Sequence, residues 1–105
     1  MGLFRKNKPQ AEYPFADAPD TAVFTCIHVL SGSEPIRYVT HDEDDEAWQF
    51  LCGGEHEEAD ARIVSLHSIW KLDPSVGQLA GMFLGSYAWR TQAAASWNIR
   101  RTQSD

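Results

Sequence analysis

Six short segments rich in β-branched and aromatic residues recur along this 105-residue chain, and glycine, proline or charged residues separate most of them. Segments of this length and composition are typical of β-strands. They span residues 21–30, 36–40, 47–52, 61–66, 84–91 and 96–101. In the third segment Trp48, Phe50 and Cys52 alternate with Gln49 and Leu51, so the first three side chains share one face. The pattern predicts an antiparallel sheet of about five to six strands.

Between the fourth and fifth segments the apolar spacing becomes helical. Leu66, Ile69 and Trp70 share a helical face, and Asp73 before Pro74 ends that first helix. Asp73 then fits as the N-cap of a second short helix with Pro74 at its first position. The apolar stripe expected for this helix is Val76, Leu79, Ala80 and Phe83. The chain is therefore predicted to be an α+β protein with a short helical segment packed on one face of the sheet.

The length of the chain corresponds to one domain. Residues 1–20 contain three prolines among charged and small residues and predict a flexible N-terminal arm, although Tyr13 and Phe15 can pin it to the body. Residues 21–101 are expected to form the single α+β domain, and residues 102–105 a disordered tail.

The formal charge is −6, and the stretch from residue 42 to residue 60 contains many acids and no lysine or arginine. An acidic chain repels phosphate, so nucleic-acid binding is not expected. No segment is apolar over the length of a membrane span, and the first residues lack the apolar run of a secretion signal. Two cysteines are too few for a disulfide framework. These features predict a cytoplasmic protein with reduced thiols and no membrane contact.

Two acidic loops, residues 41–46 and 55–60, allow two interpretations. They are either solvated loops that keep the protein soluble, or a surface that meets a basic patch on a partner. The candidate partner-binding acids are Asp42, Glu43, Asp44, Asp45, Glu46, Glu55, Glu57, Glu58 and Asp60. The first loop lacks the alternating ligands and central glycine of a calcium-binding EF-hand. Trp89, beside Arg90, is the aromatic residue that we expect as a surface anchor.

Cys26, His28, Cys52 and His56 form a candidate zinc set, because thiolate and imidazole are the ligands that zinc prefers. Cys26 and His28 are expected on one face of the first strand, and Cys52 and His56 at the end of the third. The spacing C-x-H with C-x3-H differs from the usual zinc patterns. Buried free cysteines are also common core residues. The sequence favours the core interpretation, and no cofactor is predicted.

Nothing in the sequence indicates catalysis. The serines include no G-x-S-x-G element, and the glycines match no phosphate-binding fingerprint. The chain is therefore predicted not to be an enzyme.

Several elements between residues 38 and 97 together resemble a family of short bacterial domains grouped with the immunity proteins of polymorphic toxin systems. These elements are His41-Asp42-Glu43-Asp44, Trp48-Gln49-Phe50, Gly53-Gly54-Glu55, the strand at residues 61–66, Asp73-Pro74, Leu84-Gly85-Ser86 and Trp89-Arg90. The resemblance implies a small α+β domain that binds and blocks a cognate toxin. A basic bacterial toxin suits an acidic inhibitor. The resemblance transfers no catalytic residues.

Overall fold

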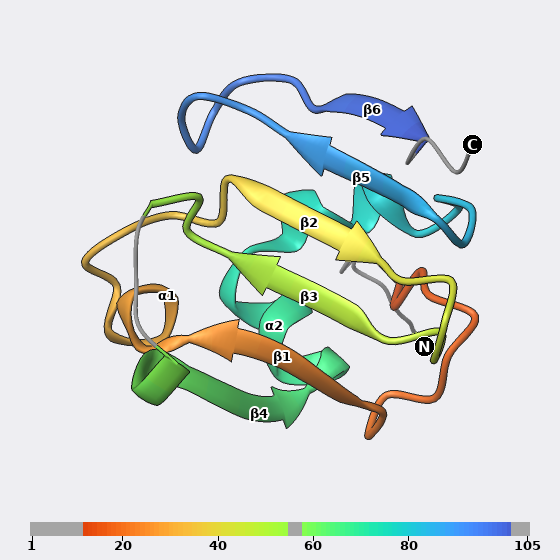
Figure 1. Ribbon diagram of the computed structural model, residues 1–105, viewed down its shortest axis with the longest axis horizontal. Helices are drawn as coiled ribbons and strands as arrows, with labels where there is room; N and C mark the ends of the chain where they lie inside the picture. The colour runs from red at the N-terminus through yellow and green to blue at the C-terminus, as the bar shows by residue number, and fades with distance from the viewer. Residues whose placement is uncertain (1–11, 55–57, 102–105) are drawn as a thin grey trace, which may run out of the picture.

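The structure, a computed structural model, describes residues 12–54 and 58–101. The described residues form a six-stranded, mostly antiparallel sheet in the order β4-β1-β3-β2-β5-β6, with short helices packed against it (Figure 1). The strands are β1 Ala22–Cys26, β2 Tyr38–His41, β3 Trp48–Leu51, β4 Ala61–Ser65, β5 Ser86–Trp89 and β6 Asn98–Arg101. The predicted α+β class is confirmed. The predicted tail and the first part of the predicted arm lie outside the described residues.

Two α-helices and two 3-10 helices connect these strands: α1 Ile27–Ser31, η2 Glu58–Asp60, α2 Leu66–Leu72 and η3 Pro74–Leu79. The Ser65 hydroxyl caps α2 by accepting a hydrogen bond from the Ser68 N–H. Asp73 caps η3 by accepting from the Ser75 N–H, and Pro74 occupies the first position. The predicted Asp73-Pro74 helix start is therefore confirmed.

The first predicted strand is too long, because β1 ends at Cys26 and α1 begins at Ile27. Gly32 adopts a left-handed conformation (φ 84°) and its N–H bonds to the Val29 carbonyl, which closes this single helical turn. β-propensity alone does not reveal that the strand gives way to a helix, because residues 27–30 (Ile-His-Val-Leu) continue the largely apolar run of β1. The prediction that Cys26 and His28 share one strand is wrong: His28 belongs to α1.

One strand pair in the sheet is parallel. β2 and β3 form an antiparallel pair, and β3 rather than β2 lies beside β1, so β3 runs in the same direction as β1. The Thr25 hydroxyl adds a link between these two strands by donating to the Phe50 carbonyl at 2.6 Å. The predicted antiparallel sheet therefore contains one parallel pair, which places the carboxyl ends of β1 and β3 at the same end of the sheet.

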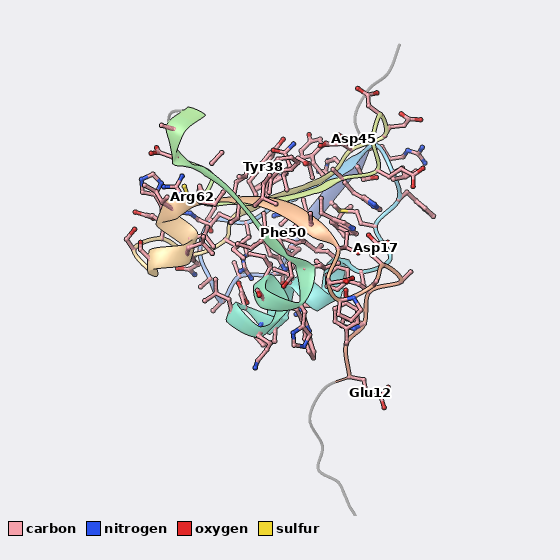
Figure 2. The ribbon with its side chains drawn as sticks, turned by 90° about the horizontal axis from the view of Figure 1, so that it is seen from below. Glu12, Asp17, Tyr38, Asp45, Phe50 and Arg62 are labelled. Atoms are coloured by element: carbon pink, nitrogen blue, oxygen red, sulfur yellow. The ribbon has the colours of Figure 1, made fainter. Side chains whose placement is uncertain are left out.

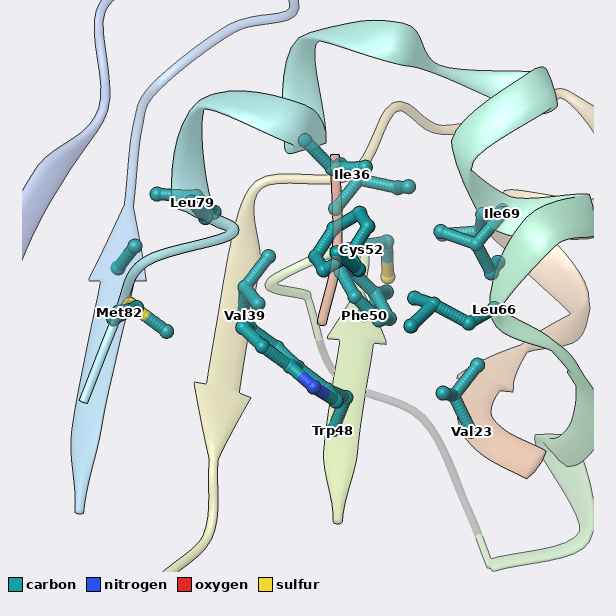
Figure 3. Close-up of a cluster of buried hydrophobic side chains, with 14 of the residues drawn as sticks. Val23, Ile36, Val39, Trp48, Phe50, Cys52, Leu66, Ile69, Leu79 and Met82 are labelled. Atoms are coloured by element: carbon teal, nitrogen blue, oxygen red, sulfur yellow. The ribbon is translucent and has the colours of Figure 1, made fainter. Parts of the chain in front are cut away.

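The hydrophobic core lies between one face of the sheet and the helices α2 and η3 (Figure 3). Val23, Val39 and Phe50 contribute from the strands, and Ile69 and Leu79 from the helices, all at most 1% exposed. Phe50 and Trp48 point into this core as the alternation in β3 predicted. Within residues 12–54 and 58–101, neither α-helix covers the other face of the sheet (Figure 1).

The packed part of the chain begins before residue 21. Phe15 is buried and its ring meets the Trp48 ring edge-on, with centroids 5.3 Å apart. The Trp48 indole N–H donates to an Asp17 carboxylate oxygen at 3.0 Å. Contacts of Phe15 and Asp17 therefore tie this part of the predicted arm to the folded body, in line with the alternative that Tyr13 and Phe15 pin it.

Phe83, predicted to lie in the apolar stripe of the second helix, and Ile99, in the last predicted strand, are both exposed. Phe83 is 70% exposed because η3 ends at Leu79, so Phe83 falls outside the helical stripe. Ile99 is 46% exposed and lies in β6, an edge strand whose four residues are all exposed.

Candidate functional site

The uncovered face of the sheet carries aromatic side chains. Tyr38 pairs with Trp89 across β2 and β5, and their strand neighbours Val39 and Ala88 point into the core. Alternation along each strand therefore places Tyr38, Tyr87 and Trp89 on the outer face. Figure 2 shows Tyr38 on the side of the sheet opposite Phe50 and the helices α2 and η3. The Tyr38 and Tyr87 rings lie 5.9 Å apart, and Trp89 is 39% exposed.

The acidic turn between β2 and β3 is held by its own hydrogen bonds. The Asp42 N–H donates to the Ala47 carbonyl at 2.8 Å, and the Ala47 N–H donates to the Asp45 carboxylate at 3.0 Å. The side-chain amide of Gln49 donates from Nε2 to the Asp42 carboxylate oxygen Oδ2 at 2.8 Å. Glu43, Asp44, Asp45 and Glu46 are exposed. The turn therefore presents its carboxylates to solvent from a fixed backbone.

Carboxylates of the acidic turn and the outer tyrosines line one open groove. The groove has a volume of about 410 Å³, and Tyr38 and Tyr87 line it together with Asp42, Glu43, Asp44 and Asp45. Within residues 12–54 and 58–101 the ion pairs join Arg37 to Glu34 and Arg90 to Asp73, so no groove carboxylate is paired with a cation there. We call this feature the acidic groove.

His41 anchors the acidic groove to the core. Its ring stacks on the Trp48 ring at 3.9 Å, and its Nδ1–H donates to the Met82 carbonyl at 2.9 Å. The Gly85 N–H in turn donates to the His41 carbonyl at 2.7 Å. The start of β5 and the end of β2 are thereby fixed to each other beneath the acidic turn.

Gly85 permits the close approach of Glu43. Gly85 has a φ of 80°, and a Cβ placed on it would lie 3.2 Å from a Glu43 carboxylate oxygen. Gly85→Ala is expected to lower the free energy of unfolding by about 1–3 kcal/mol, because a left-handed residue gains a side chain and Glu43 must move. Urea unfolding of the variant measures this cost. Gly81→Ala is the control, because its Cβ would meet no atom within 4 Å and its φ is not left-handed.

The second acidic stretch does not join the acidic groove. Its described part begins at η2, which lies beyond the end of β3, whereas the 42–46 turn precedes the start of β3 (Figure 1). Asp60 is half-buried there. Glu55 and Glu57 lie outside the described residues, as does the side chain of Glu58. The structure thus brings residues 42–45 to the outer aromatic face, and of the later acids with a described side chain it places Asp60 at the opposite end of the sheet.

A second cluster lies where β1 and β3 end. Cys26 is the last residue of β1, Cys52 follows β3 directly, and His28 lies in α1. One side-chain donor atom from each of these three residues lies within 4.8 Å of the others. Both thiols are free and buried. His56, the fourth residue of the predicted set, lies outside the described residues.

Hydrogen bonds fix the surroundings of this cluster. The Gly54 N–H donates to the Cys52 sulfur at 3.5 Å, and Arg37 Nε donates to the Cys52 carbonyl at 2.9 Å. The His28 carbonyl accepts from the Glu34 N–H at 3.1 Å. Burial is the largest influence on the Cys52 thiol and raises its pKa; the Gly54 N–H lowers it, and the adjacent Cys26 raises it further.

Tyr38 and Tyr87 are residues of the acidic groove that sequence reasoning missed. Their only signal is alternation with the buried Val39 and Ala88, and that pattern does not say which strand lies beside each of them. The groove requires β2 to pair with β5, which only the fold provides.

Comparison with protein families, curated proteins and solved structures found no match for this chain. None of the helices within residues 12–54 and 58–101 has the length and hydropathy that crossing a membrane requires.

Proposed function

We propose that this chain is a non-catalytic binding domain whose acidic groove receives a basic segment of a partner protein. The observation that carries this proposal is the convergence of four carboxylates and two tyrosines on one uncovered sheet face. Carboxylates attract lysine and arginine, and the faces of tyrosine rings attract the same cations. A basic side chain is therefore the chemical group that this groove fits best.

The rest of the outer face suits a protein partner. Trp89 lies beside Tyr38 on the same face, and exposed tryptophan and tyrosine carry much of the energy of protein interfaces. The charged turn at one end provides long-range attraction, which speeds the encounter of oppositely charged proteins. The basic partner would contact the carboxylates first and then cover the aromatic residues.

The resemblance to immunity proteins suggests which partner binds and what the binding does. We propose that the partner is a basic bacterial toxin and that the chain neutralises it in the bacterial cytoplasm, where the two thiols stay reduced. A growth assay tests this role: a toxic protein encoded beside this gene is expressed with and without the chain. Restored growth supports neutralisation. Growth arrest that persists with folded chain present contradicts it.

Charge reversal in the acidic groove should weaken binding to a basic ligand. In Glu43→Lys/Asp44→Lys, neither altered side chain accepts a hydrogen bond that holds the turn. We expect the dissociation constant for a short arginine-rich peptide to rise at least about tenfold, a loss of about 1.4 kcal/mol. Isothermal titration calorimetry at two salt concentrations measures it, and wild-type affinity should fall as salt rises.

The matched control is Glu12→Lys/Asp20→Lys. Both residues are exposed, and the net charge changes by the same amount as in the groove variant. Figure 2 shows Glu12 and Asp45 at opposite sides of the molecule. Equal losses of affinity in the two double variants would mean that only net charge matters and that the acidic groove is not the binding surface.

A further inference from the structure

We propose that Cys26, His28 and Cys52 together bind one zinc ion at the end of the sheet where the inner strands β1 and β3 terminate. This site is independent of the acidic groove, which lies at the other end of β3. Its function is structural: the ion ties α1 and the end of β3 to the end of β1.

The donor set selects the metal. Two thiolates and an imidazole suit zinc, whereas magnesium and calcium prefer oxygen ligands. A thiol pair alone is compatible with ordinary core packing, since free cysteine behaves as a small apolar residue. The imidazole brought to the same point distinguishes this cluster from such a pair.

The distances allow one ion to contact all three donors. Zinc–sulfur bonds of about 2.3 Å and zinc–nitrogen bonds of about 2.0–2.1 Å place tetrahedral ligand atoms about 3.5–3.8 Å apart. The three donor atoms lie within 4.8 Å of one another, so side-chain movements of about 1 Å bring them to that spacing. Three protein ligands leave the fourth tetrahedral position for another donor.

The backbone around the cluster is fixed. β1 is hydrogen-bonded to β3 on one side and to β4 on the other, which holds Cys26. Arg37 binds the Cys52 carbonyl, and the Gly54 N–H donates to the Cys52 sulfur. A donor aimed at sulfur stabilises the thiolate that coordinates a metal, as outer hydrogen bonds do in metal sites.

Cobalt titration tests the site directly. Co²⁺ is added without oxygen to the reduced, chelator-treated full-length chain, and absorption is recorded. We expect one Co²⁺ per chain, a thiolate-to-cobalt charge-transfer band, and loss of that band when one equivalent of Zn²⁺ is added. The thermal unfolding midpoint should rise with Zn²⁺, because zinc binds the folded state.

Substitutions assign the ligands. His28→Asn should weaken Co²⁺ affinity at least about tenfold. Loss of a residue that only hydrogen-bonds to a metal ligand already costs about tenfold or more in metal affinity, so loss of a ligand should cost at least as much. His67→Asn is the matched control: His67 lies in α2 against Trp70 and should leave affinity unchanged. Cys52→Ala should remove most of the charge-transfer intensity. Circular dichroism of each metal-free variant checks its fold, and the histidine pair decides the question if a cysteine variant does not fold.

Three results would overturn the proposal. The first is a folded, reduced wild-type chain that binds neither Co²⁺ nor Zn²⁺. The second is His28→Asn binding Co²⁺ as tightly as His67→Asn. The third is recovery of Cys26 and Cys52 as a disulfide from cells lysed under thiol-trapping conditions.

Discussion

Asp73→Ala is expected to lower the free energy of unfolding by about 3–5 kcal/mol, because it leaves the buried Arg90 without its counter-ion. The Arg90 side chain is 1% exposed and its guanidinium lies 2.8 Å from the Asp73 carboxylate. Arg90 also donates to the Ile36 carbonyl and stacks on the Trp97 ring at 3.9 Å, so it cannot turn toward water without breaking these contacts. Urea unfolding followed by tryptophan fluorescence measures the loss.

The control is the second ion pair. Glu34→Ala removes the partner of Arg37, whose side chain is 31% exposed, and should cost no more than about 1 kcal/mol. The double change Asp73→Ala/Arg90→Met should recover part of the stability lost in Asp73→Ala, because the unpaired buried charge is gone. If Asp73→Ala and Glu34→Ala lower the free energy of unfolding equally, burial of the Arg90 charge does not determine how much its ion pair stabilises the fold.

Phe50→Ala is expected to cost about 3–5 kcal/mol, the usual range for removing a buried phenylalanine ring. Phe50 is 0% exposed, and its ring lies 5.7 Å from that of Trp48 and 6.5 Å from that of Phe15. Because small domains have only about 5–15 kcal/mol of total stability, the variant should be close to unfolding at room temperature.

Phe83→Ala makes the same chemical change at a residue that is 70% exposed. Its unfolding free energy should stay within about 0.5 kcal/mol of wild type. If both phenylalanine variants lose the same stability in urea unfolding, the assignment of the core to the helix-covered face is wrong.

Local patterns predicted the elements that depend on local physics. The period of two in β3 placed Trp48 and Phe50 on the core side, and Asp73-Pro74 marked the start of η3. The error at residues 27–31 arose because an apolar run suits either a strand or a buried helical turn. Gly32 was the one local signal that a helix ends there.

Neither functional feature could be read fully from the sequence, because each requires a particular strand pairing. The acidic turn was visible, but Tyr38 and Tyr87 join it only because β2 and β5 are neighbours. Cys26 and Cys52 were both candidates, yet their spacing in the chain matched no zinc pattern. They meet because β1 and β3 are parallel, and alternation within a strand does not specify the direction of its neighbour.

Backbone NMR during titration with an arginine-rich peptide tests directly whether the acidic groove receives a basic segment. We expect chemical-shift changes to gather at Tyr38, Thr40, the 42–45 turn, Gly85 and Tyr87, and to disappear in Glu43→Lys/Asp44→Lys. Shift changes centred on α2 and η3, or spread evenly over the acidic residues of the chain, would contradict it.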